Sequence, residues 1–171
     1  MPNHVKNGIR VSGKIKDIQT LLEEVSGKNI FGDTVEFTFH KIIPMPEDVS
    51  RQEMETREAE KLGDKHWYAW CNLHWDTKWD AYDVYIRKNF PPPSIQYIGI
   101  DKGEAFICFQ SAWSPPTLVL KALINKYTHL GFEIAHLVEG NEYWGKETYK
   151  NGELIRSSDK IDTIKRFFRR F

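Results

Sequence analysis

The chain has 171 residues, of which 40% are hydrophobic and 13% aromatic, and its 24 basic residues balance 24 acidic ones. This composition is typical of one globular domain that buries a core without metals or disulfides, and it excludes a disordered chain. The zero net charge provides no global field that would attract nucleic acid or an anionic membrane, although it is compatible with a local patch.

The cysteine count and the hydropathy exclude further classes of protein. Cys71 and Cys108 are too few for a disulfide framework or for the four thiolates of an ordinary iron–sulfur cluster, so we expect no cofactor. No segment approaches the roughly 20 consecutive apolar residues of a membrane span. The N-terminal sequence MPNHVKNGIRV lacks the apolar run of a signal peptide. These features indicate a soluble cytoplasmic protein that binds no membrane.

The first elements follow from the spacing of apolar residues. Residues 4–12 alternate between apolar and polar side chains, which predicts a strand. Residues 14–26 carry apolar side chains at helical spacing on one face and stop before Gly27, which predicts a helix. Residues 34–43 alternate again, and we expect a half-buried strand that the prolines after it end.

A long excursion follows this second predicted strand. Residues 47–65 are highly charged and are expected to form a solvated loop or an exposed helix, or alternatively a flap that faces a partner. Residues 66–72 are predicted to finish a helix, and residues 74–80 to form a loop. Further strands are predicted at 81–88, 94–100 and 104–111, with a tight turn at 101–103.

The C-terminal part contains a second helix and a hairpin. Ser114 suits an N-cap and Pro115 a first turn, so a helix is predicted from there to residue 130. Asn151 and Gly152 form a strong two-residue turn signal. We also expect a strand at 132–138 and hairpin strands at 143–149 and 153–155. A final helix is predicted at 160–171, capped by Asp159, with a basic stripe on the side opposite its apolar stripe.

The order of these elements predicts an α+β protein. Strand, helix, strand, excursion, strand, helix, strand is the βαββαβ pattern of a ferredoxin-like sandwich, in which two helices cover one face of an antiparallel sheet. We expect a single domain over residues 1–171. It would carry a long insertion at about 44–103 and a C-terminal extension, a hairpin plus a helix, at about 140–171.

Several short motifs resemble one known family across almost the whole chain. They are MPNHVKN at the start, KIIPMPE at 41–47, WCNLHWDTKWDAYD at 70–83, AWSPP at 112–116 and EGNEYWG at 139–145. Together they resemble the YubB-like proteins with a ferredoxin-like domain, which are found on plasmids and phages. The resemblance implies the fold and a mobile-element origin, and it implies no catalytic mechanism. The family has a glycine where this chain has Asp76, which suggests that the turn there need not be left-handed.

Four of the six tryptophans lie between residues 66 and 83. Their rings could stack on bases or on a planar ligand, and Lys78 beside a hydroxyl would suit a phosphate. The alternative, which we prefer, is that the rings pack the excursion onto the sheet while Lys78 pairs with an aspartate (Asp76, Asp80 or Asp83) or lies over a ring. The candidate binding residues are Trp70, Asn72, Trp75, Thr77, Lys78, Trp79, Asp83 and Trp113.

The sequence gives weaker indications of a metal site or of catalytic residues. His66, Cys71 and His74 have a spacing compatible with a metal ion, but they match no standard zinc pattern. A nucleophile pair of Cys71 and His74, or a nuclease-like D-x-K at Asp76, would need partners that the sequence does not mark. We therefore predict no catalytic residue and no metal site. The basic stripe of the last helix could contact nucleic acid or an acidic protein surface, but we prefer the interpretation as a solvated helix face.

These observations favour a non-enzymatic accessory protein of a mobile element that binds a protein or nucleic-acid partner. One alternative is a nucleotide or single-stranded nucleic-acid binder that uses the Trp75–Trp79 region. Another is a small enzyme, which would require Cys71, His74 or Asp83 to converge in a pocket.

Overall fold

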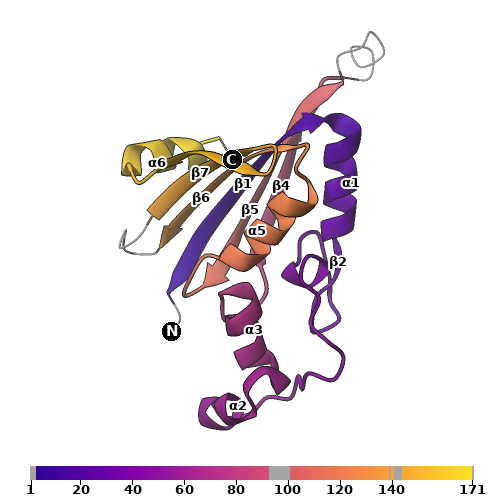
Figure 1. Ribbon diagram of the computed structural model, residues 1–171, viewed down its shortest axis with the longest axis vertical. Helices are drawn as coiled ribbons and strands as arrows, with labels where there is room; N and C mark the ends of the chain where they lie inside the picture. Colours follow the sequence, from indigo (N-terminus) through magenta and orange to yellow (C-terminus); the bar gives the residue numbers. More distant parts are fainter. Residues whose placement is uncertain (1–2, 93–100, 139, 141–143, 171) are drawn as a thin grey trace.

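The computed structural model describes residues 3–92, 101–138, 140 and 144–170. Its centre is a six-stranded antiparallel sheet in the order β4-β5-β1-β6-β7-β8 (Figure 1). The strands are β1 His4–Lys14, β4 Tyr82–Asn89, β5 Lys102–Ala112, β6 Gly131–Val138, β7 Trp144–Lys150 and β8 Glu153–Ser158. Helices α1 (Ile15–Val25) and α5 (Thr117–Lys126) cover one face, and α6 (Ile161–Phe168) packs on the other.

The predicted ferredoxin-like fold is confirmed by the order β1-α1-β4-β5-α5-β6, which is the βαββαβ pattern. β1 lies between β5 and β6, and its alternate residues Val5, Ile9 and Val11 are fully buried beneath the helices. The apolar stripe of α1 meets them with residues Ile15, Ile18, Leu21, Leu22 and Val25. Period-2 and period-3.6 patterns in neighbouring segments therefore specify one shared core.

The strand predicted at 34–43 is wrong. Only Thr34–Val35 (β3) pairs, with Gly27–Lys28 (β2), and residues Phe39–Lys41 form a 3-10 turn, η1. Phe37 and Phe39 alternate because both are buried against Phe109 of the sheet, not because they belong to a ladder. β4 instead occupies the second-strand position beside β5, so residues 82–89, which were expected in the excursion, belong to the core sheet.

Three short helical elements follow η1 before β4. They are α2 (Thr56–Leu62), η2 (Gly63–Lys65) and α3 (Trp67–Trp75). α2 is exposed except for Ala59, in agreement with one of the two expectations for this charged segment. α3 runs three residues further than predicted, to Trp75, because Trp70, Cys71 and Trp75 are all buried against the domain core.

The C-terminal hairpin and final helix are confirmed. Asn151 and Gly152 have φ values of 54° and 78°, as a two-residue hairpin turn requires. α6 begins after Lys160, so Asp159 is not its N-cap. α5 begins after Pro116, without a side-chain cap from Ser114, and ends at Lys126.

Two further expectations concern the start of β5. Lys102 and Gly103 already belong to β5 and pair with Lys14 and Gly13 of β1, so they do not form the predicted turn. The strand predicted at 94–100 lies outside the described residues. Among the helices in the described ranges, none is both long enough and apolar enough to cross a membrane.

Candidate functional site

Two turns are joined by hydrogen bonds at the end of β5. Thr77 is fully buried, and its hydroxyl donates to the Ala112 carbonyl (2.7 Å) and accepts from the Ala112 amide (3.2 Å). The Ser114 hydroxyl donates to the Asp76 carbonyl, and the Ser111 hydroxyl donates to the Ser114 carbonyl (2.7 Å). Residues 76–79 and 112–114 therefore form one rigid unit, although they are far apart in the chain.

This unit holds Lys78 among three aromatic rings. Its Nζ lies 4.7 Å from the ring centroid of Trp79, 4.7 Å from that of Trp113 and 5.6 Å from that of Tyr68. A cation within about 6 Å of a ring face is attracted by the ring quadrupole. We call these four residues the Lys78 cage. The preferred expectation, that Lys78 lies over rings, agrees with these contacts.

The backbone around the cage is unusual at three non-glycine residues. Trp113 has φ 72°, Asp76 has φ 63° and Asp83, in the β-bulge of β4, has φ 49°. The left-handed region costs an L-residue about 1–2 kcal/mol, and for a bulky tryptophan it is a clear outlier. The expectation that Asp76 need not be left-handed is wrong, because Asp76 is the left-handed cap that ends α3.

The eight candidate residues divide into three groups. Lys78, Trp79 and Trp113 come together in the cage. Trp70, Trp75 and Thr77 are buried beneath it, with the Trp75 indole donating to the Ile43 carbonyl (3.0 Å). Asn72 donates to the Tyr68 carbonyl on α3 (2.7 Å), and Asp83 accepts from the Gln110 amide across the sheet (2.9 Å).

Comparison with known proteins identifies the family. The family model described as "Ferredoxin-like domain in Api92-like protein" matches residues 64–165, more than half of the chain. The chain belongs to this Api92-like family. A crystal structure of the protein api92 from Yersinia pseudotuberculosis has a similar fold, with a TM-score of 0.59 over 94% of this chain and 98% of that one. The sequence identity is 8%, so the likeness concerns the fold alone. None of the curated proteins matches the sequence.

The candidate residues did not include Tyr68 of the cage, nor Trp67 and Phe31, whose rings continue from it in this Api92-like chain. Tyr68 supplies the third ring, and its place one helical turn before Asn72 was the available signal. Rings continue beyond it: Tyr68 meets Trp113 and Trp67 edge to face (6.1 and 6.0 Å), and Trp67 meets Phe31 (5.8 Å). Phe31, Trp67, Tyr68 and Trp113 thus form an aromatic ladder whose two end residues are 57% and 44% exposed.

Asp80 has a structural role that anchors the cage from below. Its buried carboxylate accepts from the Thr38 hydroxyl (2.5 Å) and from the amides of Phe39 (2.7 Å) and Ala81 (2.8 Å). Burial raises the pKa of Asp80, although these hydrogen bonds act in the opposite direction. The carboxylate is therefore engaged by residues of its own core and is directed away from solvent.

The charges of α2, near the Lys78 cage, balance one another. Burial, and then the nearby charge of Glu60 on α2, raise the pKa of Tyr68. Arg57 and Lys61 of the same helix offset Glu58 and Glu60, so α2 adds no net charge on this side.

The predicted thiol and imidazole residues are engaged elsewhere. Burial, followed by the charge of Asp80, raises the pKa of Cys71 and keeps it as an unreactive thiol. His66 bonds the Gln52 carbonyl (2.8 Å) and the Tyr68 amide (3.3 Å), whereas His74 stacks on Trp70. Within the part of the chain that the structure describes, no three His, Cys, Asp or Glu residues gather in a metal-binding arrangement.

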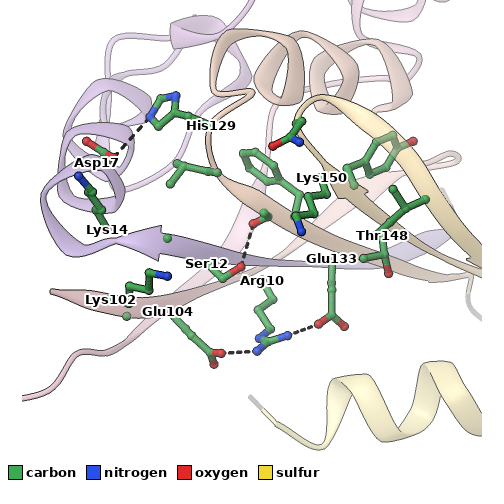
Figure 2. Close-up of a pocket in the computed structure, with 18 residues that line it drawn as sticks. Arg10, Ser12, Lys14, Asp17, Lys102, Glu104, His129, Glu133, Thr148 and Lys150 are labelled. Carbon is green, nitrogen blue, oxygen red and sulfur yellow. Dashed lines mark hydrogen bonds and ion pairs between the residues drawn. The ribbon is translucent and has the colours of Figure 1, made fainter. Parts of the chain in front are cut away.

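A cavity of about 890 Å³ lies at the other end of the sheet, where β1 ends (Figure 2). Lysines 14, 102 and 150 line it together with Asp17, Glu104 and Glu133, so the two signs of charge nearly balance. Figure 2 shows the Arg10 side chain directed between Glu104 and Glu133, on the side of the sheet where α6 lies. Because both signs of charge line the cavity, its charge favours neither an anionic nor a cationic ligand.

Proposed function

We propose that the protein is a non-enzymatic accessory protein of a plasmid or phage that binds another protein through the aromatic ladder and the Lys78 cage. The observation that carries the proposal is Trp113. Its side chain is 44% exposed, yet its backbone is held in a left-handed conformation that costs about 1–2 kcal/mol. Strain of this kind persists only where the surrounding structure holds the backbone in place. Here the hydrogen bonds of Thr77 and Ser114 do so.

The composition of the surface supports a protein partner. Tryptophan and tyrosine are the residues that most often dominate the binding energy of protein interfaces. Here they are already ordered by ring contacts and by the Lys78 cation, so little side-chain entropy remains to be lost on binding.

The surroundings of Lys78 and Trp75 support a protein partner over nucleic acid at this site. The Lys78 charge, which a phosphate would need, is already shared among three rings. Trp75, which a base-stacking role in the Trp75–Trp79 region would need, is fully buried.

The mobile-element setting rests on the motifs that resemble the YubB-like proteins, above all the segment WCNLHWDTKWDAYD. That segment supplies both Lys78 and Trp79 of the cage, together with the buried residues that support it. The motif and the Lys78 cage therefore overlap.

Affinity capture with matched baits tests the proposal. Wild-type protein, Trp113→Ala and Leu154→Ala are immobilised and exposed to the same bacterial lysate. Leu154 is a similarly exposed apolar residue on β8, far from the cage. We expect a protein that the wild type and Leu154→Ala retain and that Trp113→Ala loses, and that binds the purified wild type directly in calorimetry. If folded Trp113→Ala captures the same proteins as the wild type, the proposal is overturned.

A further inference from the structure

The face of the main sheet opposite α1 and α5 has features that the Lys78 cage does not use. On this face α6 packs over β6 and β7, where Ile164 and Phe167 meet Ala135 (Figure 1). The face continues across β1 and β5 to the edge strand β4. Two hollows of about 690 and 460 Å³ lie along it, the first beside Lys6 and Gln110 and the second beside Arg87 and Phe106.

The second hollow has an excess of positive charge. Arg10, Arg87, Arg169 and Arg170 line it, against Glu104 and Glu133. Both carboxylates are paired with Arg10, and Glu133 is also paired with Lys146 (2.5 Å) and lies 3.9 Å from Arg170 (Figure 2). Two carboxylates are thus shared by three cations, while Arg87 and Arg169 add further charge. The hollow is therefore complementary to an anion.

The same face presents flat groups beside a shallow floor. Tyr85 is 53% exposed on β4, and its partner on β5, Cys108, is small and partly exposed, whereas Gly8 and Ala135 further across the sheet are buried. Two residues further along β4, the Arg87 guanidinium lies 4.8 Å from the centroid of the Phe106 ring. Bases stack on aromatic rings and on guanidinium planes, and the small Cys108 side chain between them leaves room for a base.

We propose that this face binds a single strand of nucleic acid. Bases lie against Tyr85 and Arg87 beside Cys108, and the phosphates contact Arg169, Arg170 and Lys6. A duplex would bury its bases away from Tyr85, and an acidic peptide would have no use for an exposed ring beside a guanidinium plane. The surface is separate from the Lys78 cage, and the inference does not depend on the proposed protein partner.

Fluorescence anisotropy with a labelled mixed-sequence DNA strand of about 16 nucleotides tests the proposal at a series of salt concentrations. We expect wild-type binding that weakens with salt. Tyr85→Ala should weaken it about fivefold or more at fixed salt, as loss of a stacking ring does. Arg87→Gln should weaken it through loss of the flat cation. Arg169→Gln should weaken it and reduce the slope of log K against log salt by about 0.7, the value for one phosphate contact on a single strand.

Matched variants make the result specific. Lys121→Gln removes an exposed charge from α5 on the opposite face, and Trp113→Ala removes the proposed protein-binding ring. Both should bind the strand as the wild type does. Arg87→Lys, which keeps the charge without the flat guanidinium, should fall between Arg87→Gln and the wild type.

Four outcomes would overturn the proposal. These are no binding at low salt, equal binding of a duplex of the same sequence, full competition by polyglutamate, and a Tyr85→Ala variant that binds as tightly as the wild type. Thermal melts of each variant confirm that it is folded, which these exposed positions permit.

Discussion

Lys78→Met tests whether the cage is held together by its positive charge. Methionine keeps most of the length and apolar bulk of the side chain but removes the ammonium. The Lys78 Nζ lies within 4.7, 4.7 and 5.6 Å of three ring centroids, and each such contact is worth about 0.5–1 kcal/mol where it is partly exposed. The three rings share one charge, so their contributions do not sum fully.

We therefore expect Lys78→Met to lower the free energy of unfolding by about 1–2 kcal/mol. For a chain of this length that corresponds to a fall in Tm of about 2–8 °C. Urea denaturation followed by tryptophan fluorescence measures the free energy, and the melt followed by circular dichroism measures Tm. Lys121→Met, at an exposed lysine of α5, is the matched control and should change stability by less than about 0.5 kcal/mol.

A double-mutant cycle isolates the interaction itself. Lys78→Met and Trp113→Ala, alone and combined, should give a coupling energy of about 0.5–1 kcal/mol. If the coupling energy were zero, or if Lys78→Met were as stable as the wild type, the rings would be ordered by packing alone. The reasoning about the cage would then be refuted.

Three other substitutions have expected outcomes that denaturation also measures. Thr77→Val leaves the buried amide and carbonyl of Ala112 without their side-chain partner and should cost about 1–3 kcal/mol, whereas Thr77→Ser should cost less than half of that. Asp76→Gly removes the cost of a left-handed non-glycine residue and a negative charge at the C-terminus of α3, and it should raise the free energy of unfolding by about 0.5–1 kcal/mol. Asp76→Ala should show no gain. Burial alone would raise the pKa of Glu133, but hydrogen bonds and charges from Lys146 and Arg10 outweigh it and lower the pKa below 4.5. The stabilisation that ionised Glu133 provides is thus present above pH 4.5 and is lost as pH falls through the lowered folded-state pKa. The wild type should therefore lose more stability on acidification than Glu133→Gln. Equal losses would contradict this.

Local patterns in the sequence were sufficient to predict the helices, strands and turns whose partners are close in the chain. The Asn151–Gly152 turn carries its own backbone requirement, and the apolar stripe of residues 15–25 needs only the strand before it. The identity of the second core strand was a different problem. Residues 34–43 and 82–89 both alternate, and only the pairing of β4 with β5 decides between them. Phe37 and Phe39 imitate a strand because an aromatic cluster buries both.

In the candidate site, too, local features could be predicted from the sequence and features set by distant contacts could not. The density of tryptophans around Lys78 was visible in the sequence, and ring contacts around that lysine were an expected alternative. The left-handed Asp76 and Trp113 were not visible, because they are fixed by hydrogen bonds between turns that are 35 and 38 residues apart. Backbone conformations that tertiary contacts impose leave no local signature in residue types.

The position of β1 in the sheet has a consequence for how the protein is made. β1 is the first strand to be synthesised, yet its neighbours are β5 and β6, which begin at residues 102 and 131. At about 5–20 residues per second, the ribosome needs on the order of 10 s to complete the second neighbour. During that interval both edges of an apolar strand lack their native partners. Newly made chains should therefore depend on chaperones until β6 has emerged, and chains that end before β5 should aggregate.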